Sequence, residues 1–273
     1  MTRAIYKIAR HEFIRVLSHP IAMFAAIVLI LVVLLNGLGE AHHEQEAGNL
    51  ESQPLWDTTV SWFTSTWWAI NVVCTMMAAF LGATSILYER WNNSISVLLS
   101  KPLYRWDFIL GKFIGLSLFM LAFNTFILLL TSLSTIIFYK PPQSDFEFVW
   151  RLIAYILILT LGCSLIIALN MFFGILSKNI LVVTSISIIY IFYEWIWSSG
   201  NLIGSLSNYT PVELYYKLIC PFIIAGDPIP LFDTLVSFDR WIYAILPFLA
   251  IIFIELSALL LAEIFLFSRE NSV

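Results

Sequence analysis

Long stretches with few or no charged residues recur along the whole chain, and they constrain the fold more than any other feature. An α-helix rises 1.5 Å per residue, so about 20 apolar residues cross the hydrocarbon core of a bilayer. Six segments fit this requirement, and each predicts a membrane-spanning helix. The predicted spans are residues 21–38, 60–88, 108–139, 152–177, 180–197 and 241–267.

Composition also indicates a protein that is surrounded by lipid. Hydrophobic residues make up 60% of the 273 residues and charged residues only 12%, whereas soluble domains carry about 25% charged residues. We therefore predict an all-α, polytopic membrane protein that forms one domain over residues 1–273, without a soluble catalytic domain. The net charge of −4 excludes the overall basic character typical of nucleic-acid-binding proteins.

Lysine and arginine are distributed unequally between the two sides of the predicted bundle. With six spans both termini lie on one side, and ten of the 14 basic residues fall there. The remaining four are Lys140, Arg151, Lys217 and Arg240. Because cytoplasmic segments are enriched in Lys and Arg, we predict a multi-pass protein of the cell membrane with both termini in the cytoplasm.

Residues 1–20 precede the first span and show a helical pattern. Apolar residues recur at helical spacing at Ile5, Ile8, Ala9, Phe13, Val16 and Leu17. The basic residues, which lie largely off this stripe, are Arg3, Lys7, Arg10 and Arg15. This pattern predicts an amphipathic helix on the inner membrane surface that ends near Pro20. The alternative is a basic tail that only sets the topology.

Two connecting segments are long enough to suggest a function. Residues 89–107 form the predicted inner loop, and residues 198–240 form the predicted outer loop before the sixth span. The outer loop contains the apolar run Leu218–Phe232, which is too short and too rich in proline to cross the membrane as a helix. We predict that it forms a re-entrant or interfacial hairpin packed against the bundle.

The motifs of common enzyme classes do not occur in the sequence. Gly111-Lys112 lacks the upstream glycine of a phosphate-binding loop, and Phe113 stands where Ser or Thr would bind magnesium. We therefore predict that this chain does not hydrolyse ATP, is not an enzyme and binds no cofactor. His42, His43, Glu44 and Glu46 could contact a transition metal, but a solvated acidic loop is the preferred interpretation, so no metal site is predicted.

The inner loop has the features of a short helix between two long ones. Glu89-Arg90 follows the second span, Asn93 and Ser94 are possible helix caps, and Pro102 ends the segment. Between them lies the apolar patch Ile95–Leu99. The patch could dock into a groove on a partner protein or pack against its own bundle. The residues alone do not decide between these interpretations.

The same segment resembles the hallmark of ABC type-2 transporter permeases. The residues that carry this resemblance are Glu89, Arg90, Ser96, Leu98, Leu99, Ser100, Pro102, Arg105, Phe108, Ile109, Gly111 and Lys112. The family often has a glycine shortly after the acid–base pair, where this chain has Trp91-Asn92-Asn93. The basic N-terminal helix, the six spans and the apolar outer loop extend the resemblance over essentially the whole chain.

The resemblance implies a permease that is half of a transmembrane core. Two chains, identical or paralogous, would pair around a central path, and each would dock an ATP-binding subunit that carries the ATP and Mg²⁺. Residues 92–99 would form the coupling helix, and residues 1–20 the connecting helix. The residues implied in coupling are Glu89, Arg90, Asn93, Ser96, Leu98, Leu99, Ser100, Pro102 and Arg105. Most relatives export lipids, glycans, peptides or drugs, and some belong to systems that mature copper enzymes.

Two carboxylates fall within the sixth predicted span. Glu255 is nearest its middle, where a charge costs roughly 2.5–3.5 kcal/mol on insertion scales. It is a candidate for the transport path or the dimer interface, with a hydrogen-bonded packing role as the alternative. Glu263 is expected near the inner headgroups, paired with a basic residue. An ion-coupled secondary transporter is the alternative function, because Glu255 is compatible with it, although such proteins usually contain paired repeats and we find none.

Overall fold

The computed structural model describes residues 2–47, 58–91, 105–138, 144–177, 179–196, 210–220, 231 and 237–270. All regular structure within these ranges is helical, which confirms the all-α prediction. The helices are α1 (Thr2–Leu17), α2 (Pro20–Ala47), α3 (Thr58–Trp91), α5 (Arg105–Phe138), α6 (Asp145–Leu176), α7 (Ile180–Ile196), α8 (Pro211–Ile219) and α9 (Phe238–Glu270).

Each predicted span coincides with a helix, namely α2, α3, α5, α6, α7 or α9. Four of these are long and apolar enough to cross a membrane on their own, over Ala69–Glu89, Trp106–Ser134, Phe146–Leu176 and Phe238–Arg269. α2 meets this requirement only together with α1, as a pair bent by 58°, and α7 is a shorter apolar helix. The chain is therefore a multi-pass membrane protein, and separate crossings by α2 and α7 remain predictions.

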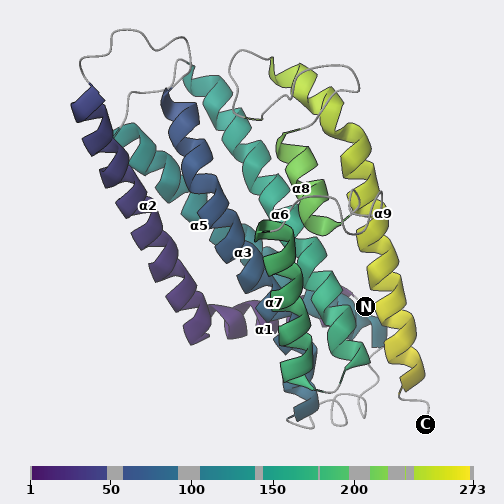
Figure 1. Cartoon of the computed structure of the whole chain (residues 1–273). Helices are drawn as coiled ribbons and strands as arrows, with labels where there is room; N and C mark the ends of the chain where they lie inside the picture. Colours follow the sequence, from purple (N-terminus) through teal and green to yellow (C-terminus); the bar gives the residue numbers. More distant parts are fainter. Residues whose placement is uncertain are drawn as a thin grey trace.

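The long helices run side by side in alternating directions, whereas α1 lies across one end of the bundle (Figure 1). α6 packs against α3, α5, α7, α8 and α9, so it forms the centre of the assembly. The C-terminal end of α9 lies at the same end of the bundle as α1 (Figure 1). The two ends of the described chain therefore share one side, as an even number of crossings requires.

The bend between α1 and α2 follows from Pro20. Proline disfavours a helical conformation in the residue before it, but it is well accepted at the first position of a new helix. α1 accordingly ends at Leu17, and α2 begins at Pro20. The backbone NH of His19 donates to the carbonyl of Val16 at 3.0 Å, which closes the last turn of α1 before the chain changes direction.

Part of the long outer loop folds back into the bundle as α8. Its residues Val212, Leu214, Tyr215 and Leu218 are buried, and the helix packs against α6, α7 and α9. The buried helix begins at Pro211, ahead of the predicted hairpin at Leu218–Phe232 and overlapping it only at its last two residues, so the hairpin itself stays a prediction. Leu231, in the second part of the predicted hairpin, donates its backbone NH to Ile219 at 2.8 Å. Residues 221–230 and 232–236 lie outside the described ranges.

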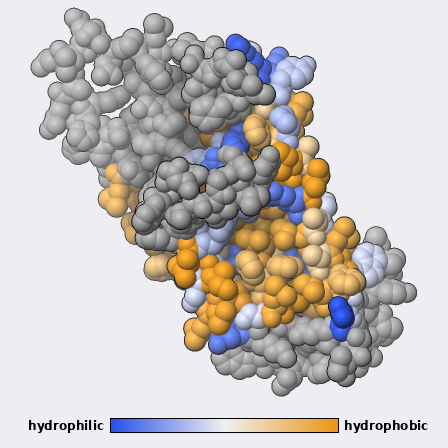
Figure 2. Space-filling model, turned by 45° about the vertical axis from the view of Figure 1, so that its right-hand side comes forward, coloured by the Kyte–Doolittle hydropathy of each residue, from blue (hydrophilic) through white to orange (hydrophobic). Residues whose placement is uncertain are grey.

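The outer surface of the bundle is largely apolar. Large hydrophobic side chains such as Phe24 on α2, Leu133 on α5, Leu181 on α7 and Ile254 on α9 are exposed. Figure 2 shows hydrophobic residues covering most of the described surface between the two ends of the molecule. Soluble monomers rarely expose patches of this extent, so this surface fits contact with lipid or with another membrane-embedded chain.

Candidate functional site

Helix α1 is held against α5 by two glycines that leave no room for side chains. A Cβ atom at Gly111 would lie 2.8 Å from the Cβ of Ile8, and one at Gly115 would lie 2.6 Å from the carbonyl oxygen of Ala9. The two helices therefore approach backbone to backbone. This close contact carries the inner face of α1, including Glu12, into the interior at the inner end of the bundle.

Lys112 occupies the centre of this junction and is only 1% exposed. Its ammonium group donates three hydrogen bonds: to Glu12 Oε2 at 3.2 Å, to Glu89 Oε1 at 3.2 Å and to the carbonyl of Ser85 at 2.9 Å. An ammonium group has three donors, so Lys112 is fully satisfied. Through these bonds a single side chain on α5 joins α1 to the last turns of α3.

Arg15 completes a group of four charges. Its guanidinium donates to Glu12 Oε1 and lies 3.9 Å from Glu89 Oε1, so each carboxylate faces both bases. Two positive and two negative groups balance, which is the condition under which buried charges are tolerated. We call Glu12, Arg15, Glu89 and Lys112 the inner charge cluster.

Aromatic side chains extend the inner charge cluster to a fourth helix. The Lys112 ammonium lies 5.2 Å from the centre of the Phe108 ring, and Phe108 stacks on Phe267 of α9 at 5.6 Å. Arg15 in turn lies 5.2 Å from the centre of the Tyr88 ring. Stacking and cation–π contacts of this kind fix orientation. The inner ends of α1, α3, α5 and α9 are thus packed into one body.

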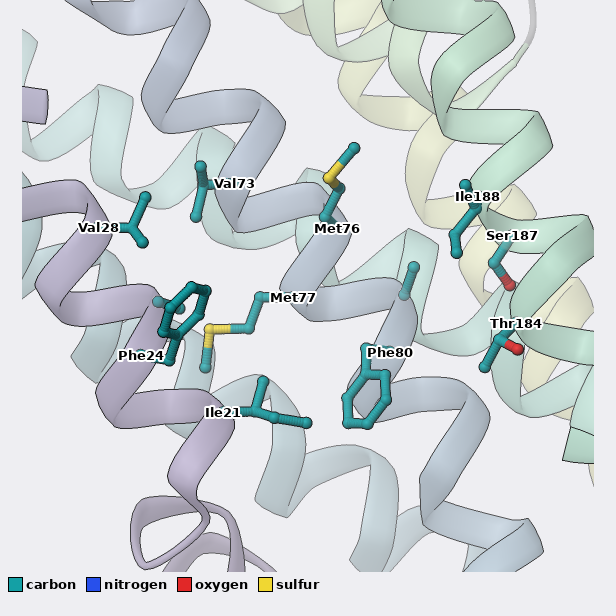
Figure 3. Close-up of a pocket in the computed structure, with 12 residues that line it drawn as sticks. Ile21, Phe24, Val28, Val73, Met76, Met77, Phe80, Thr184, Ser187 and Ile188 are labelled. Atoms are coloured by element: carbon teal, nitrogen blue, oxygen red, sulfur yellow. The ribbon is translucent and has the colours of Figure 1, made fainter. Parts of the chain in front are cut away.

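An apolar groove opens on the side of the bundle formed by α2, α3 and α7. It has a volume of about 380 Å³, and in Figure 3 Phe24 of α2 and Met77 of α3 project into it. Thr184 and Ser187 of α7 place hydroxyl groups along its edge (Figure 3). The Ser187 hydroxyl lies 2.7 Å from the carbonyl of Val183 and also contacts Asn170 Oδ1. The groove is open and almost entirely hydrophobic, so it suits an apolar or amphipathic molecule.

The sequence matches the family model for ABC-2 family transporter proteins over residues 6–270, which is nearly the whole chain. The chain belongs to the ABC-2 transporter family. A comparison with curated proteins finds no significant match. The resemblance that the segment from Glu89 to Lys112 carries is therefore confirmed at the level of the family, and the chain is a permease component of an ABC transporter.

The structure brings together only some of the residues that mark an ABC-2 permease. Glu89 and Lys112, at the two ends of the family-like segment, meet at the inner charge cluster, and Gly111 packs against Ile8 of α1. Arg90 lies in the last turn of α3, and Arg105 is the first residue of α5. The structure does not describe the side chain of either residue. The other predicted coupling residues fall in residues 92–104, which the structure does not describe; they are Asn93, Ser96, Leu98, Leu99, Ser100 and Pro102.

The basic residues of α1 do not behave alike. Lys7 and Arg10 are exposed, whereas Arg15 turns inward to Glu12 and Glu89. α1 itself is not a helix that buries its whole apolar stripe in lipid, because Ala9 and Val16 pack into the protein. Leu17, expected on that stripe, is 57% exposed. The side chain of Arg3 lies outside the description.

Glu12 is the member of the inner charge cluster that the sequence prediction missed. It is 1% exposed and pairs with two bases. A signal was present, because Glu12 lies on the apolar stripe, at helical spacing from Ile8, Ala9 and Val16. A lone acid on such a stripe usually indicates a buried partner of opposite charge, but the partner, Lys112, lies far away in the sequence.

The two carboxylates of α9 differ in burial. Glu255 is half-buried, and its role in a path or interface remains a prediction. Among the described residues, no base forms an ion pair with Glu263, which was expected to have one. Glu263 is completely buried, and within the described ranges neither of its oxygens has a hydrogen-bond partner. The helix turns it toward the bundle instead of toward the headgroups.

Proposed function

We propose that this ABC-2 permease is the membrane-embedded half of an ATP-driven exporter and works with a separate ATP-binding subunit. In this proposal the ATP-binding subunit docks on residues 92–104 at the cytoplasmic side and carries the ATP and Mg²⁺. A second permease chain, identical or paralogous, completes the core. Membership of the family supports the pairing with an ATP-binding subunit, because ABC-2 permeases generally have one.

The inner charge cluster is the observation that carries the proposal. The segment proposed to dock the partner leaves α3 two residues after Glu89 and enters α5 at Arg105, about two turns before Lys112. These two side chains are hydrogen-bonded to each other at 3.2 Å, and Glu12 ties α1 to them. A displacement of the segment would therefore move the inner ends of α1, α3 and α5 together.

The groove formed by α2, α3 and α7 is our candidate for the transport path. α2 continues from α1, and α3 carries Glu89 in its last turn, so two of the three helices that form the groove connect directly to the inner charge cluster. A tilt of these helices would widen or narrow the groove, as in rigid-body switching of helices. A second copy facing the groove would enclose it. The apolar lining favours a lipid-like or amphipathic cargo.

The orientation in the proposal places α1 and both termini in the cytoplasm, in the cell membrane. It is supported by the exposed bases Lys7 and Arg10 on α1 and by Arg269 near the end of α9, all at the same end of the bundle. Lysine and arginine are enriched on the cytoplasmic side.

The proposal is tested by isolating the complex from membranes and identifying the proteins that purify with it. We expect an ATPase with a phosphate-binding loop. Replacing Leu98 or Leu99 by Asp should release that ATPase and stop ATP-driven transport in reconstituted vesicles, while Arg240→Gln on the opposite side should do neither. If an ion gradient alone drives solute transport by the purified chain, the chain is a secondary transporter and the proposal is wrong.

A further inference from the structure

The face of α1 that points away from the bundle is itself divided into two edges. Six described side chains are exposed on this face: Tyr6, Lys7, Arg10, His11, Ile14 and Leu17. At 3.6 residues per turn, Tyr6 and Leu17 fall on one edge and Lys7 and His11 on the other, with Arg10 and Ile14 between them. A helix with an apolar edge beside a basic one is typical of the headgroup level of a membrane.

Among the residues that the structure describes, the bases at the outward edge of this face have no acidic partner. Within the described part of the chain, neither Lys7 nor Arg10 has a carboxylate at ion-pair distance, whereas Arg15 faces Glu12 and Glu89. Lys7, Arg10 and His11 line a shallow hollow of about 360 Å³, together with Tyr6 and Ile14. The hollow thus combines uncompensated positive charge with an aromatic and an aliphatic side chain.

We propose that this hollow binds the phosphate of an anionic phospholipid from the cytoplasmic leaflet. Lys7 and Arg10 supply the charge, His11 lies beside them, and the acyl chains lie along Tyr6 and Leu17. Arginine and lysine are the usual ligands of phosphate groups. The inference goes beyond the proposed function, because it concerns neither the cargo nor the ATP-binding subunit.

A lipid fits this face better than an acidic protein surface does. The apolar edge at Leu17 leads into α2, where Met23 is 63% exposed. The basic hollow is therefore continuous along the chain with surface that suits acyl chains. A bound headgroup would neutralise the outward charge of α1 while its opposite face stays packed on α5.

The test uses the full-length permease, with any co-purifying subunits, in nanodiscs of equal parts phosphatidylglycerol and phosphatidylcholine. Lipids retained by the protein are counted by native mass spectrometry. We expect phosphatidylglycerol to be enriched. Each basic residue near an anionic surface strengthens binding to that surface about fivefold. The double variant Lys7→Gln, Arg10→Gln should therefore lower the enrichment of phosphatidylglycerol by more than tenfold on this scale. Arg240→Gln, an exposed base at the opposite end, should leave it unchanged.

Arg10→Gln alone provides a milder variant, with about a fivefold loss expected, and the melting temperature of each variant shows that it is folded. Equal retention of the two lipids by the wild type would overturn the proposal. Unchanged enrichment in both variants would do the same. If the double variant loses the ATP-binding subunit but keeps the phosphatidylglycerol enrichment, this face of α1 binds protein instead of lipid.

Discussion

The two ends of the bundle are held together by different chemistry. At the inner end, four charges join α1, α3 and α5. In the outer half, three neutral side chains join α3, α6 and α8: Asn71 Oδ1 accepts hydrogen bonds from Tyr155 at 3.2 Å and from Tyr215. All three outer residues are buried. Both groups connect three helices, yet they differ in what is left behind when one member is removed.

This difference indicates which end moves as a unit and which can loosen. Removing one partner from a buried ion pair strands a charge in a low-dielectric interior, which costs about 3–5 kcal/mol. Removing one neutral hydrogen bond costs only about 0.5–1.5 kcal/mol. We therefore expect the inner junction to stay intact during a transport cycle, while α8, a helix of nine residues, is the element that detaches most easily.

The largest effect should come from Lys112→Met. Glu12 and Glu89 would then share only Arg15, and we expect stability to fall by about 3–5 kcal/mol because a carboxylate is left uncompensated. The midpoint of thermal unfolding in detergent, followed by tryptophan fluorescence, measures this loss. Adding Glu12→Gln restores the balance of charge and should recover part of the stability. A Lys112→Met variant as stable as the wild type would show that the inner charge cluster contributes nothing to the stability of the fold.

A smaller effect should come from Gly115→Ala, which tests the close contact that buries Glu12. The new Cβ would lie 2.6 Å from the backbone oxygen of Ala9, so α1 must move, at a cost of about 1–3 kcal/mol. Gly174→Ala is the matched control, because its Cβ would be 3.6 Å from the nearest atom. The two melting temperatures are compared directly. Equal stability of the two variants would contradict the tight packing of α1 on α5.

Tyr215→Phe should have a modest and local effect in the outer half. It removes the bond from α8 to Asn71, worth about 0.5–1.5 kcal/mol, while Tyr155 still donates to the same oxygen. We expect faster maleimide labelling of Cys220, which is half-exposed at the end of α8, whereas Cys74 and Cys163 stay buried. Tyr155→Phe is the control, since it leaves the bond from α8 to Asn71 in place. Faster labelling in the control than in Tyr215→Phe would show that the hydrogen bond from Tyr215 to Asn71 does not hold α8 in place.

The smallest effect should come from Glu213→Gln on α8. Its carboxylate lies 4.0 Å from Lys217 one turn later, and the Glu213 side chain is 35% exposed. Exposed pairs at this spacing contribute about 0.3–0.5 kcal/mol, so the melting temperature should barely change. A loss comparable to that of Lys112→Met would remove the distinction between the charged inner end and the outer half.

The helical fold could be predicted from the sequence because a bilayer demands long apolar segments, and each predicted span coincides with a helix. Prediction was weaker where local pattern and tertiary packing disagree. The apolar run at Leu218–Phe232 indicated a buried hairpin, but it did not reveal that the buried helix begins at Pro211. Its first turns contain Leu214 and Tyr215, whose burial depends on packing against α6 and α9.

The site was only partly predictable for a similar reason. Glu89 and Lys112 were found through the resemblance to ABC-2 permeases, because their spacing is a family feature. Glu12 was missed, and Arg15 was expected on the polar side of an interfacial helix. Their inward orientation depends on the close approach that Gly111 and Gly115 allow between α1 and α5, and no pattern within α1 alone contains that information.

The packing of α1 on α5 leads us to expect that the two helices move as a single body while ATP is hydrolysed. The ring centres of Phe13 on α1 and Phe119 on α5 lie 6.0 Å apart, so cysteines at these two positions, in a background without the native cysteines, can be joined by a short bis-thiol reagent with a reducible linker. The measurement is ATP hydrolysis by the assembled complex before and after cross-linking. The account predicts an unchanged rate in the cross-linked complex. A rate that collapses on cross-linking and returns with reductant would show that α1 must slide on α5, which contradicts it.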